Sequence, residues 1–156
     1  MPWTKAETRK LVERIKAAFA SCKYPGDDQL VTNTSDEDLE SVQIANAFRG
    51  KTWEDISLEM LEYHRGDLIF FTPEAFCHYL PAYLIAAITG GKVLGLELRA
   101  SLVDSLTPPR KPGYALDWFM ERAKRFTPAQ VGVIQDYFCL MSEKHDIKYL
   151  RYWLTR

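Results

Sequence analysis

The chain has 156 residues, of which 47% are hydrophobic and 26% are charged, and its formal net charge is −1 at pH 7. This composition is that of a globular protein and excludes a disordered chain, and the length suits one ordinary domain with a sizeable core. A net charge near zero also argues against nucleic acid as a partner, because phosphate binding requires an excess of lysine and arginine. From the length and composition we expect one domain over residues 1–156, and the patterns described next predict that this domain is helical.

The apolar runs and the cysteines of the sequence indicate the cellular compartment of the protein. The longest apolar block, Tyr79 to Ile88, is interrupted by Pro81 and is far too short to cross a bilayer. The N-terminus is charged from Lys5 onward and has no apolar run of the kind found in signal peptides. The cysteines are three, widely spaced and without a Cys-x-x-Cys pair, which is typical of reduced thiols. We expect a cytoplasmic protein that does not bind a membrane.

Helix-start patterns recur from the N-terminus onward. Thr4 followed by Glu7 is a capping box, and an apolar stripe at helical spacing comes after it. Ser35, with Asp38 three residues later, predicts the N-cap of a second helix at about 36–48. The inward face of that helix is expected to hold Leu39, Val42, Ala45 and Phe48.

A third helix is predicted at about 53–63, because Thr52 and Asp55 have the spacing of a helix start. The apolar residues at 67–71 follow one another without helical gaps, which favours one short extended segment there. The residues expected to face inward from the third helix are Trp53, Ile56, Met60 and Leu61.

The longest predicted helix covers about 73–89. Thr72 is placed to cap it, and Pro73 suits the first helical position, where its missing N–H would have no partner within the helix. The same start recurs at Thr127 and Pro128. Since this helix is apolar on nearly every side, we expect it to be the central buried helix, kinked at Pro81.

The remaining chain also reads as helices. Residues 93–106 fit a helix whose inward positions include Val93 and Leu96, although 92–98 also alternates in part like a strand. A proline-rich connector at 107–113 precedes three further helical runs. The prediction for the whole chain is an all-α fold, a single compact domain of about seven helices.

One stretch resembles a known family. The residues Phe71-Thr72-Pro73-Glu74-Ala75-Phe76, followed by Tyr79-Leu80-Pro81-Ala82-Tyr83, resemble a bacterial domain family of unknown function. That family is marked by a Thr-Pro-Glu-Ala helix start and a Tyr-Leu-Pro-Ala segment. The likeness covers about Trp53 to Ile88, with a looser match through Gln130. It implies a mostly helical fold and no assigned activity.

No pattern in the sequence predicts a reaction. Glu74 and His78 could share one face of a helix, but two ligands do not make a metal site. Cys77 next to His78 cannot form a nucleophile–base pair, because adjacent helical residues point about 100° apart. We therefore expect no catalytic residue, no metal and no cofactor. The alternative is an enzyme or small-ligand-binding domain with a pocket near the Pro81 kink, formed by His78, Tyr79 and Tyr83.

The charges are distributed unevenly along the chain. Residues 27–74 carry twelve acidic and three basic side chains, whereas the segments on either side each have a net charge of +4. Such an excess of carboxylates repels polyanions and attracts cationic partners. Asp55, Glu59 and Glu62 would also form one stripe on a continuous third helix, with Leu58 nearby as an apolar contact.

The function that this pattern favours is a binding module. Its acidic face, on the helices at about 36–48 and 53–63, would bind and inhibit a basic protein, such as a toxin or an enzyme, in the manner of an immunity or inhibitor protein. A solvated acidic face that only keeps the protein soluble is the competing interpretation. The residues expected to bind the partner are Asp36, Glu37, Glu40, Asp55, Leu58, Glu59 and Glu62.

Overall fold

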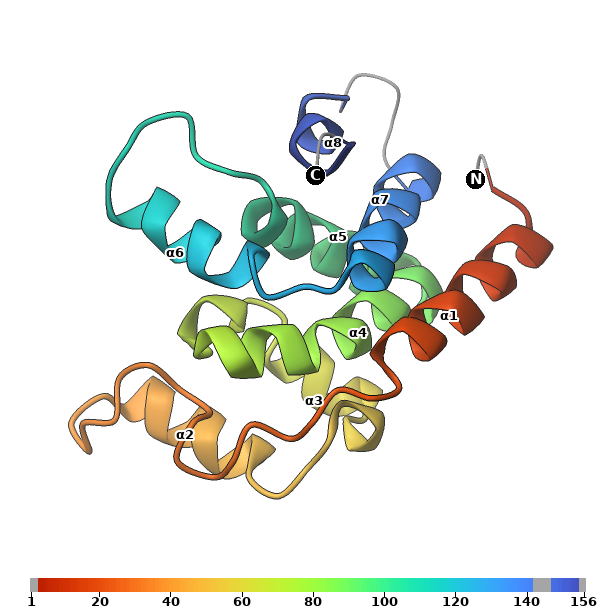
Figure 1. The fold of residues 1–156 in the computed structure, drawn as a ribbon. Helices are drawn as coiled ribbons and strands as arrows, with labels where there is room; N and C mark the ends of the chain where they lie inside the picture. Colours follow the sequence, from red (N-terminus) through yellow and green to blue (C-terminus); the bar gives the residue numbers. More distant parts are fainter. Residues whose placement is uncertain (1–2, 142–146, 155–156) are drawn as a thin grey trace. The chain divides into compact units, whose positions relative to one another are not determined.

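The computed structural model describes residues 3–141 and 147–154 (Figure 1). Over these residues it consists of eight α-helices and two short 3₁₀-helices, and the all-α prediction is confirmed. The α-helices are α1 (Lys5–Phe19), α2 (Leu39–Phe48), α3 (Leu58–Tyr63), α4 (Pro73–Thr89), α5 (Lys92–Leu106), α6 (Tyr114–Ala123), α7 (Pro128–Met141) and α8 (Ile147–Leu154); the 3₁₀-helices are η1 (Trp53–Asp55) and η2 (Leu68–Phe70).

Contacts divide the chain into two compact units, which we describe separately. The terminal unit combines Met1–Ser21 with Leu106–Arg156, and the central unit is Cys22–Ser105. The acidic segment, residues 27–74, and the long buried helix expected at 73–89 both belong to the central unit. The expectation of one domain over 1–156 stays a prediction.

In the terminal unit, α1 packs against α7, and α7 packs against α8 (Figure 1). The Gln130 side-chain amide donates a hydrogen bond to the carbonyl of Ala18 at 3.3 Å, and Arg14 forms an ion pair with Asp136. Trp153 of α8 is fully buried, and its indole N–H donates to the Leu106 carbonyl at 2.8 Å. Side-chain hydrogen bonds and an ion pair thus connect α1 with α7, and α8 with Leu106.

The buried helix expected at 73–89 is confirmed as α4. Twelve of its seventeen residues are buried, and they lie on every side of the helix rather than on one stripe. Its start follows from local chemistry: the Thr72 hydroxyl accepts a hydrogen bond from the Ala75 N–H at 3.0 Å, and Pro73 occupies the first turn. The helix continues through Pro81 to Thr89.

The extended segment expected at 67–71 is instead the 3₁₀-helix η2, and that prediction was wrong. Leu68 and Phe71 are both buried and lie three residues apart, which is the repeat of a 3₁₀-helix, while Ile69 between them is 61% exposed. Only Phe71 pairs in β fashion, in an isolated antiparallel bridge with Val31. A single bridge offers too few hydrogen bonds to extend a strand.

The second helix begins later than predicted. Asp38, not Ser35, is the N-cap of α2, because its carboxylate accepts a hydrogen bond from the Ser41 N–H at 3.2 Å. Ser35 instead accepts from the Glu37 N–H in the preceding turn. The inward face changes as well: Leu39, at the first helical position, is 72% exposed. The buried residues of α2 are Ser41, Ile44 and Phe48.

The third helix is broken into two. The capping box of Thr52 and Asp55 is present, but it starts only the single 3₁₀ turn of η1. Ile56 is extended, and Ser57 then begins α3 as a second N-cap by accepting from the Met60 N–H. A continuous helix at 53–63 was therefore a wrong prediction, because a second capping residue lies inside that range.

Residues 92–98 are helical, within α5. Its buried apolar residues are Leu98, Leu102 and Leu106, whereas Val93 and Leu96 are exposed, contrary to prediction. Gly95 explains the shift, since a Cβ at this position would lie 3.1 Å from the Ala87 carbonyl oxygen of α4. The inward face is thus marked by a residue without a side chain, which an apolar pattern cannot reveal.

The two matched helix starts give a test of stability. Thr72 caps α4 and also donates to the Gln29 carbonyl at 2.6 Å, whereas Thr127 caps α7 through the Gln130 N–H. We expect Thr72→Ala to lower the free energy of unfolding by about 2 kcal/mol and Thr127→Ala by about 1 kcal/mol. Urea unfolding followed by circular dichroism measures both. Equal losses would show that the Gln29 contact contributes nothing.

Candidate functional site

The structure places all seven predicted partner-binding residues at the surface of the central unit. They lie in four places along the chain: the turn before α2, the first turn of α2, η1 and α3. Leu58, the apolar member of the set, is 53% exposed. These residues are Asp36, Glu37, Glu40, Asp55, Leu58, Glu59 and Glu62.

The carboxylates of this region are not neutralised by ion pairs. Ten acidic residues lie between Asp27 and Glu62, and in the part of the chain that the structure describes no lysine or arginine nitrogen lies within 4.0 Å of any of their carboxylate oxygens. Acidic side chains elsewhere do form such pairs, as Glu97 with Arg65 and Glu121 with Lys124 show. The region thus carries a negative potential that its own cations leave largely uncompensated.

The predicted stripe of Asp55, Glu59 and Glu62 does not form on one helix. The break at Ile56 separates Asp55 from α3, where Glu59 and Glu62 lie one turn apart. Asp55 has a local role: its carboxylate accepts from the N–H and the hydroxyl of Thr52, both at 3.0 Å. These hydrogen bonds, the backbone one foremost, hold the pKa of Asp55 below its usual value.

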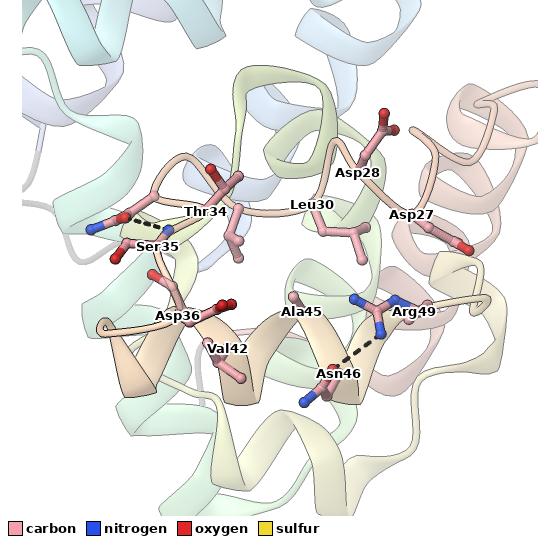
Figure 2. A pocket seen from close by; sticks show the side chains of 13 residues that line it. Asp27, Asp28, Leu30, Thr34, Ser35, Asp36, Val42, Ala45, Asn46 and Arg49 are labelled. Carbon is pink, nitrogen blue, oxygen red and sulfur yellow. Dashed lines mark hydrogen bonds between the residues drawn. The ribbon is translucent and has the colours of Figure 1, made fainter.

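A cleft of about 510 Å³ lies between the loop at 27–36 and α2 (Figure 2). Its residues come from both sides, and only Asp36 belongs to the predicted set. No pattern in the sequence predicted a cavity here. The lining residues are Asp27, Asp28, Leu30, Val31, Asn33, Thr34, Ser35, Asp36, Ser41, Val42, Ala45, Asn46 and Arg49.

Charged and apolar groups occupy different parts of the cleft. Figure 2 shows Asp36 at one end of the cleft, and Asp27 with Asp28 on the loop at the other end. At that second end the guanidinium of Arg49, the C-cap of α2, points into the cleft, and the Asp28 carboxylate points away from it. Between the two ends the loop and α2 contribute apolar surface. The side chains that form this middle part are Leu30, Val42 and Ala45.

Hydrogen bonds fix the loop to both ends of α2. Beyond its C-terminus, the Gly50 N–H donates to the Tyr24 hydroxyl at 2.8 Å, and this hydroxyl donates to the Asp27 carboxylate at 2.6 Å. Burial and the Asp27 hydrogen bond raise the pKa of Tyr24. At the N-terminus, the Asn33 amide donates to the Asp38 carboxylate at 2.9 Å. The two walls of the cleft therefore keep their spacing without a ligand.

Three polar residues of α4 bind the main chain of the acidic segment. The Tyr79 hydroxyl donates to the Lys51 carbonyl at 2.6 Å, and the Tyr83 hydroxyl donates to the His64 carbonyl at 2.9 Å. The Trp53 N–H donates to His78 Nε2 at 3.1 Å. Burial raises the pKa of both tyrosines, as expected for hydroxyls that serve as neutral donors. The alternative pocket of His78, Tyr79 and Tyr83 near Pro81 stays a prediction. The hydrogen bonds described for these three side chains all join backbone groups.

His78 is held as a neutral imidazole. It is 2% exposed, and because Nε2 accepts the Trp53 N–H, the proton of the neutral ring belongs on Nδ1. Burial lowers the pKa of His78, and the Lys23 backbone opposes this shift only in part. Within residues 3–141 and 147–154, no cluster of three or more His, Cys, Asp or Glu side chains could hold a metal ion.

Comparison with known proteins assigns the chain to a family. DUF6714, a family of unknown function, matches residues 7–154. The chain belongs to this family. The resemblance to a family of unknown function is thus confirmed, and the match extends well beyond the stretch from Trp53 to Ile88. No curated protein and no solved structure matches the chain. Across the helices that the structure describes, none is long and apolar enough to span a membrane.

The buried His78 predicts how stability responds to acid. In the unfolded chain its pKa is about 6.5, whereas burial lowers that pKa in the folded state. The unfolded state therefore binds more protons, and the free energy of unfolding should fall as the pH drops below about 6.5. His78→Gln retains an acceptor for the Trp53 N–H but does not titrate. Urea unfolding between pH 7.5 and pH 5 should show a smaller loss for this variant; parallel curves would contradict a buried neutral His78.

Proposed function

We propose that this protein is a small soluble protein-binding module whose acidic surface binds a basic protein and inhibits it, as an immunity or inhibitor protein does. The observation that carries the proposal is the set of ten acidic residues from Asp27 to Glu62 without an ion-pair partner among the described residues. Nine of these side chains are exposed. A cationic partner would supply the missing counter-charges.

The division of charge between the two units supports this proposal. The central unit carries fourteen acidic and six basic side chains, a net charge of −8, while the terminal unit carries +7. The overall charge of −1 conceals this difference. A field of one sign over a single unit accelerates encounter with an oppositely charged protein and disfavours partners of the same sign.

Exposed apolar side chains accompany the carboxylates. Interfaces take most of their affinity from a few apolar or aromatic side chains, with charges around them that set rate and specificity. The acidic segment offers such side chains, and their exposed fractions range from 53% to 72%. They are Leu39, Leu58, Tyr63 and Ile69.

Inhibition requires only that the bound module covers the working surface of its partner. Blocking a partner in this way needs no catalytic residue, because a carboxylate-rich face can occupy a site that normally binds a polyanion or another acidic group. The odd number of widely spaced cysteines supports a cytoplasmic location for the complex.

Charge reversal on α3 tests the proposal. Glu59→Lys with Glu62→Lys places two cations on the exposed face of the central unit and should lower the association rate of a basic partner about tenfold or more at low salt. The partner is first captured on the immobilised chain from lysate of the natural host, then purified, and its association rate is measured by surface plasmon resonance from 20 to 500 mM NaCl. Its own activity is assayed with and without the chain.

Glu13→Lys is the control for the single variants Glu59→Lys and Glu62→Lys, because it reverses one carboxylate on α1 in the terminal unit, where Glu13 lies 3.6 Å from Lys16. This control should leave the association rate within about twofold of wild type. The proposal fails if the captured partners are not basic, if their association rate does not depend on salt, or if the α3 variant binds them as the control does.

A further inference from the structure

We propose that the cleft between the 27–36 loop and α2 binds the C-terminal end of the basic partner. The terminal carboxylate binds Arg49, the last side chain is apolar and lies on the middle of the cleft, and a basic side chain two residues earlier lies at Asp36. This inference rests on the proposed function and names the segment of the partner that the cleft recognises.

Arg49 is a cation that points into the cleft and has no anion of its own. Figure 2 shows its guanidinium directed inward, and Nη1 donates to the side-chain oxygen of Asn46 at 3.1 Å. Among the described residues, no carboxylate oxygen lies within 4.0 Å of its nitrogens. A guanidinium has five N–H donors in a planar fork that matches the two oxygens of a carboxylate. Arg49 therefore offers a binding site for a carboxylate.

The neighbouring acidic residues leave this cation available to a ligand. The Asp27 carboxylate accepts the Tyr24 hydroxyl at 2.6 Å, and the Asp28 carboxylate points away from the cleft (Figure 2). At the other end, Asp36 forms no ion pair with a described residue. Because the central unit has a net charge of −8, it repels an isolated anion. The ligand that suits both ends thus carries a cation as well as a carboxylate.

Hydrogen bonds bridge the loop and α2 at both ends of the cleft. Just beyond Arg49, the Gly50 N–H donates to the Tyr24 hydroxyl at 2.8 Å, and at the start of α2 the Asn33 amide donates to the Asp38 carboxylate at 2.9 Å. A segment that continued past Arg49 would meet the first of these bridges, whereas a chain that ends at Arg49 would not. A C-terminus therefore fits this end of the cleft better than an internal segment does.

The middle of the cleft is apolar and already formed in the free protein. Because the two bridges hold the loop, binding does not have to order it, which favours affinity for a short segment. The volume of about 510 Å³ is within the range of ligand pockets. We expect the last side chain of the bound segment to be apolar, since the side chains that it would contact are Leu30, Val42 and Ala45.

The length of the cleft sets the position of the basic residue. The hydrogen bond to Asn46 places the Arg49 guanidinium at the level of that residue. From Asn46 back to Ser41, the first lining residue of α2, is five residues, or about 7.5 Å at 1.5 Å per residue. Two residues of extended chain span about 6.6 Å, and side chains two residues apart point to the same face. A basic residue two positions before the C-terminus therefore reaches the Asp36 end.

Four pentapeptides test the inference on the full chain. The probe is acetyl-Gly-Ser-Lys-Ser-Leu with a free carboxylate, its matched control is the same peptide as the C-terminal amide, and two further peptides replace lysine with glutamine in each form. Titrated into ¹⁵N-labelled protein, the probe should shift the backbone amides of 27–36 and 41–49. It should bind about tenfold more tightly than the amide and about threefold more tightly than the glutamine acid. The amide is cationic and the probe has no net charge, so a surface that only attracts cations would prefer the amide.

Variants assign the two charges of the probe to their sites. Arg49→Gln should remove the preference for the carboxylate over the amide. Asp36→Asn should remove the preference for lysine over glutamine and retain the first preference. Arg65→Gln is the matched control for Arg49→Gln, because Arg65 lies outside the cleft, in an ion pair with Glu97 at 2.6 Å. This control should change neither preference.

The failure of the inference can be told apart from the failure of the proposed function. If the amide binds as tightly as the acid, or if Arg49→Gln leaves the preference for the acid unchanged, the inference is overturned. The proposed function then stands as long as the lysine peptides bind better than the glutamine peptides. If the peptides bind but lysine gives no advantage in either form, both fail. If none of the four binds, or if the probe shifts α3 and not the cleft, the inference alone is overturned.

Discussion

The acidic surface depends on the hydrogen bonds that α4 makes to the main chain of residues 48–64. Tyr79, Tyr83 and His78 are buried, and the two tyrosine hydroxyls and His78 Nε2 each form a hydrogen bond with a backbone group of that segment. Buried polar atoms without these partners would destabilise the fold, so the helix and the segment hold one another in place. Because the connection is made through backbone, the carboxylate side chains of the segment stay free to face solvent.

Some helices could be predicted from sequence because their starts are unambiguous. Thr72 before Pro73, and Thr127 before Pro128, place a cap and a first turn in one position only, and α4 and α7 begin there. The acidic segment was harder, since several residues can cap. Asp38 competes with Ser35, and Ser57 starts a second helix inside the range expected for one. The apolar face of α5 was misread for another reason, because Gly95 marks close packing without adding apolar character.

The candidate site was predictable in its charge and not in its shape. The excess of carboxylates at 27–74 is a property of composition, and the structure shows nine of those twelve acidic residues exposed. The cleft is created by contacts between residues far apart in the chain, such as Tyr24 with Gly50 and Thr72 with Gln29, which leave no local pattern. The three polar residues of α4 were recognised as a group, yet only the fold shows that backbone groups are their partners.

The central claim is that the acidic side chains of 27–62 form a negative surface not neutralised by the protein itself. Amide relaxation enhancement by soluble nitroxides of positive, neutral and negative charge measures this potential residue by residue. The account predicts that the cationic probe relaxes the amides of 27–40 and 54–62 more strongly than the neutral probe at low salt, that the anionic probe does the reverse, and that 0.5 M NaCl removes the difference. Equal enhancement by all three probes over these residues would contradict it.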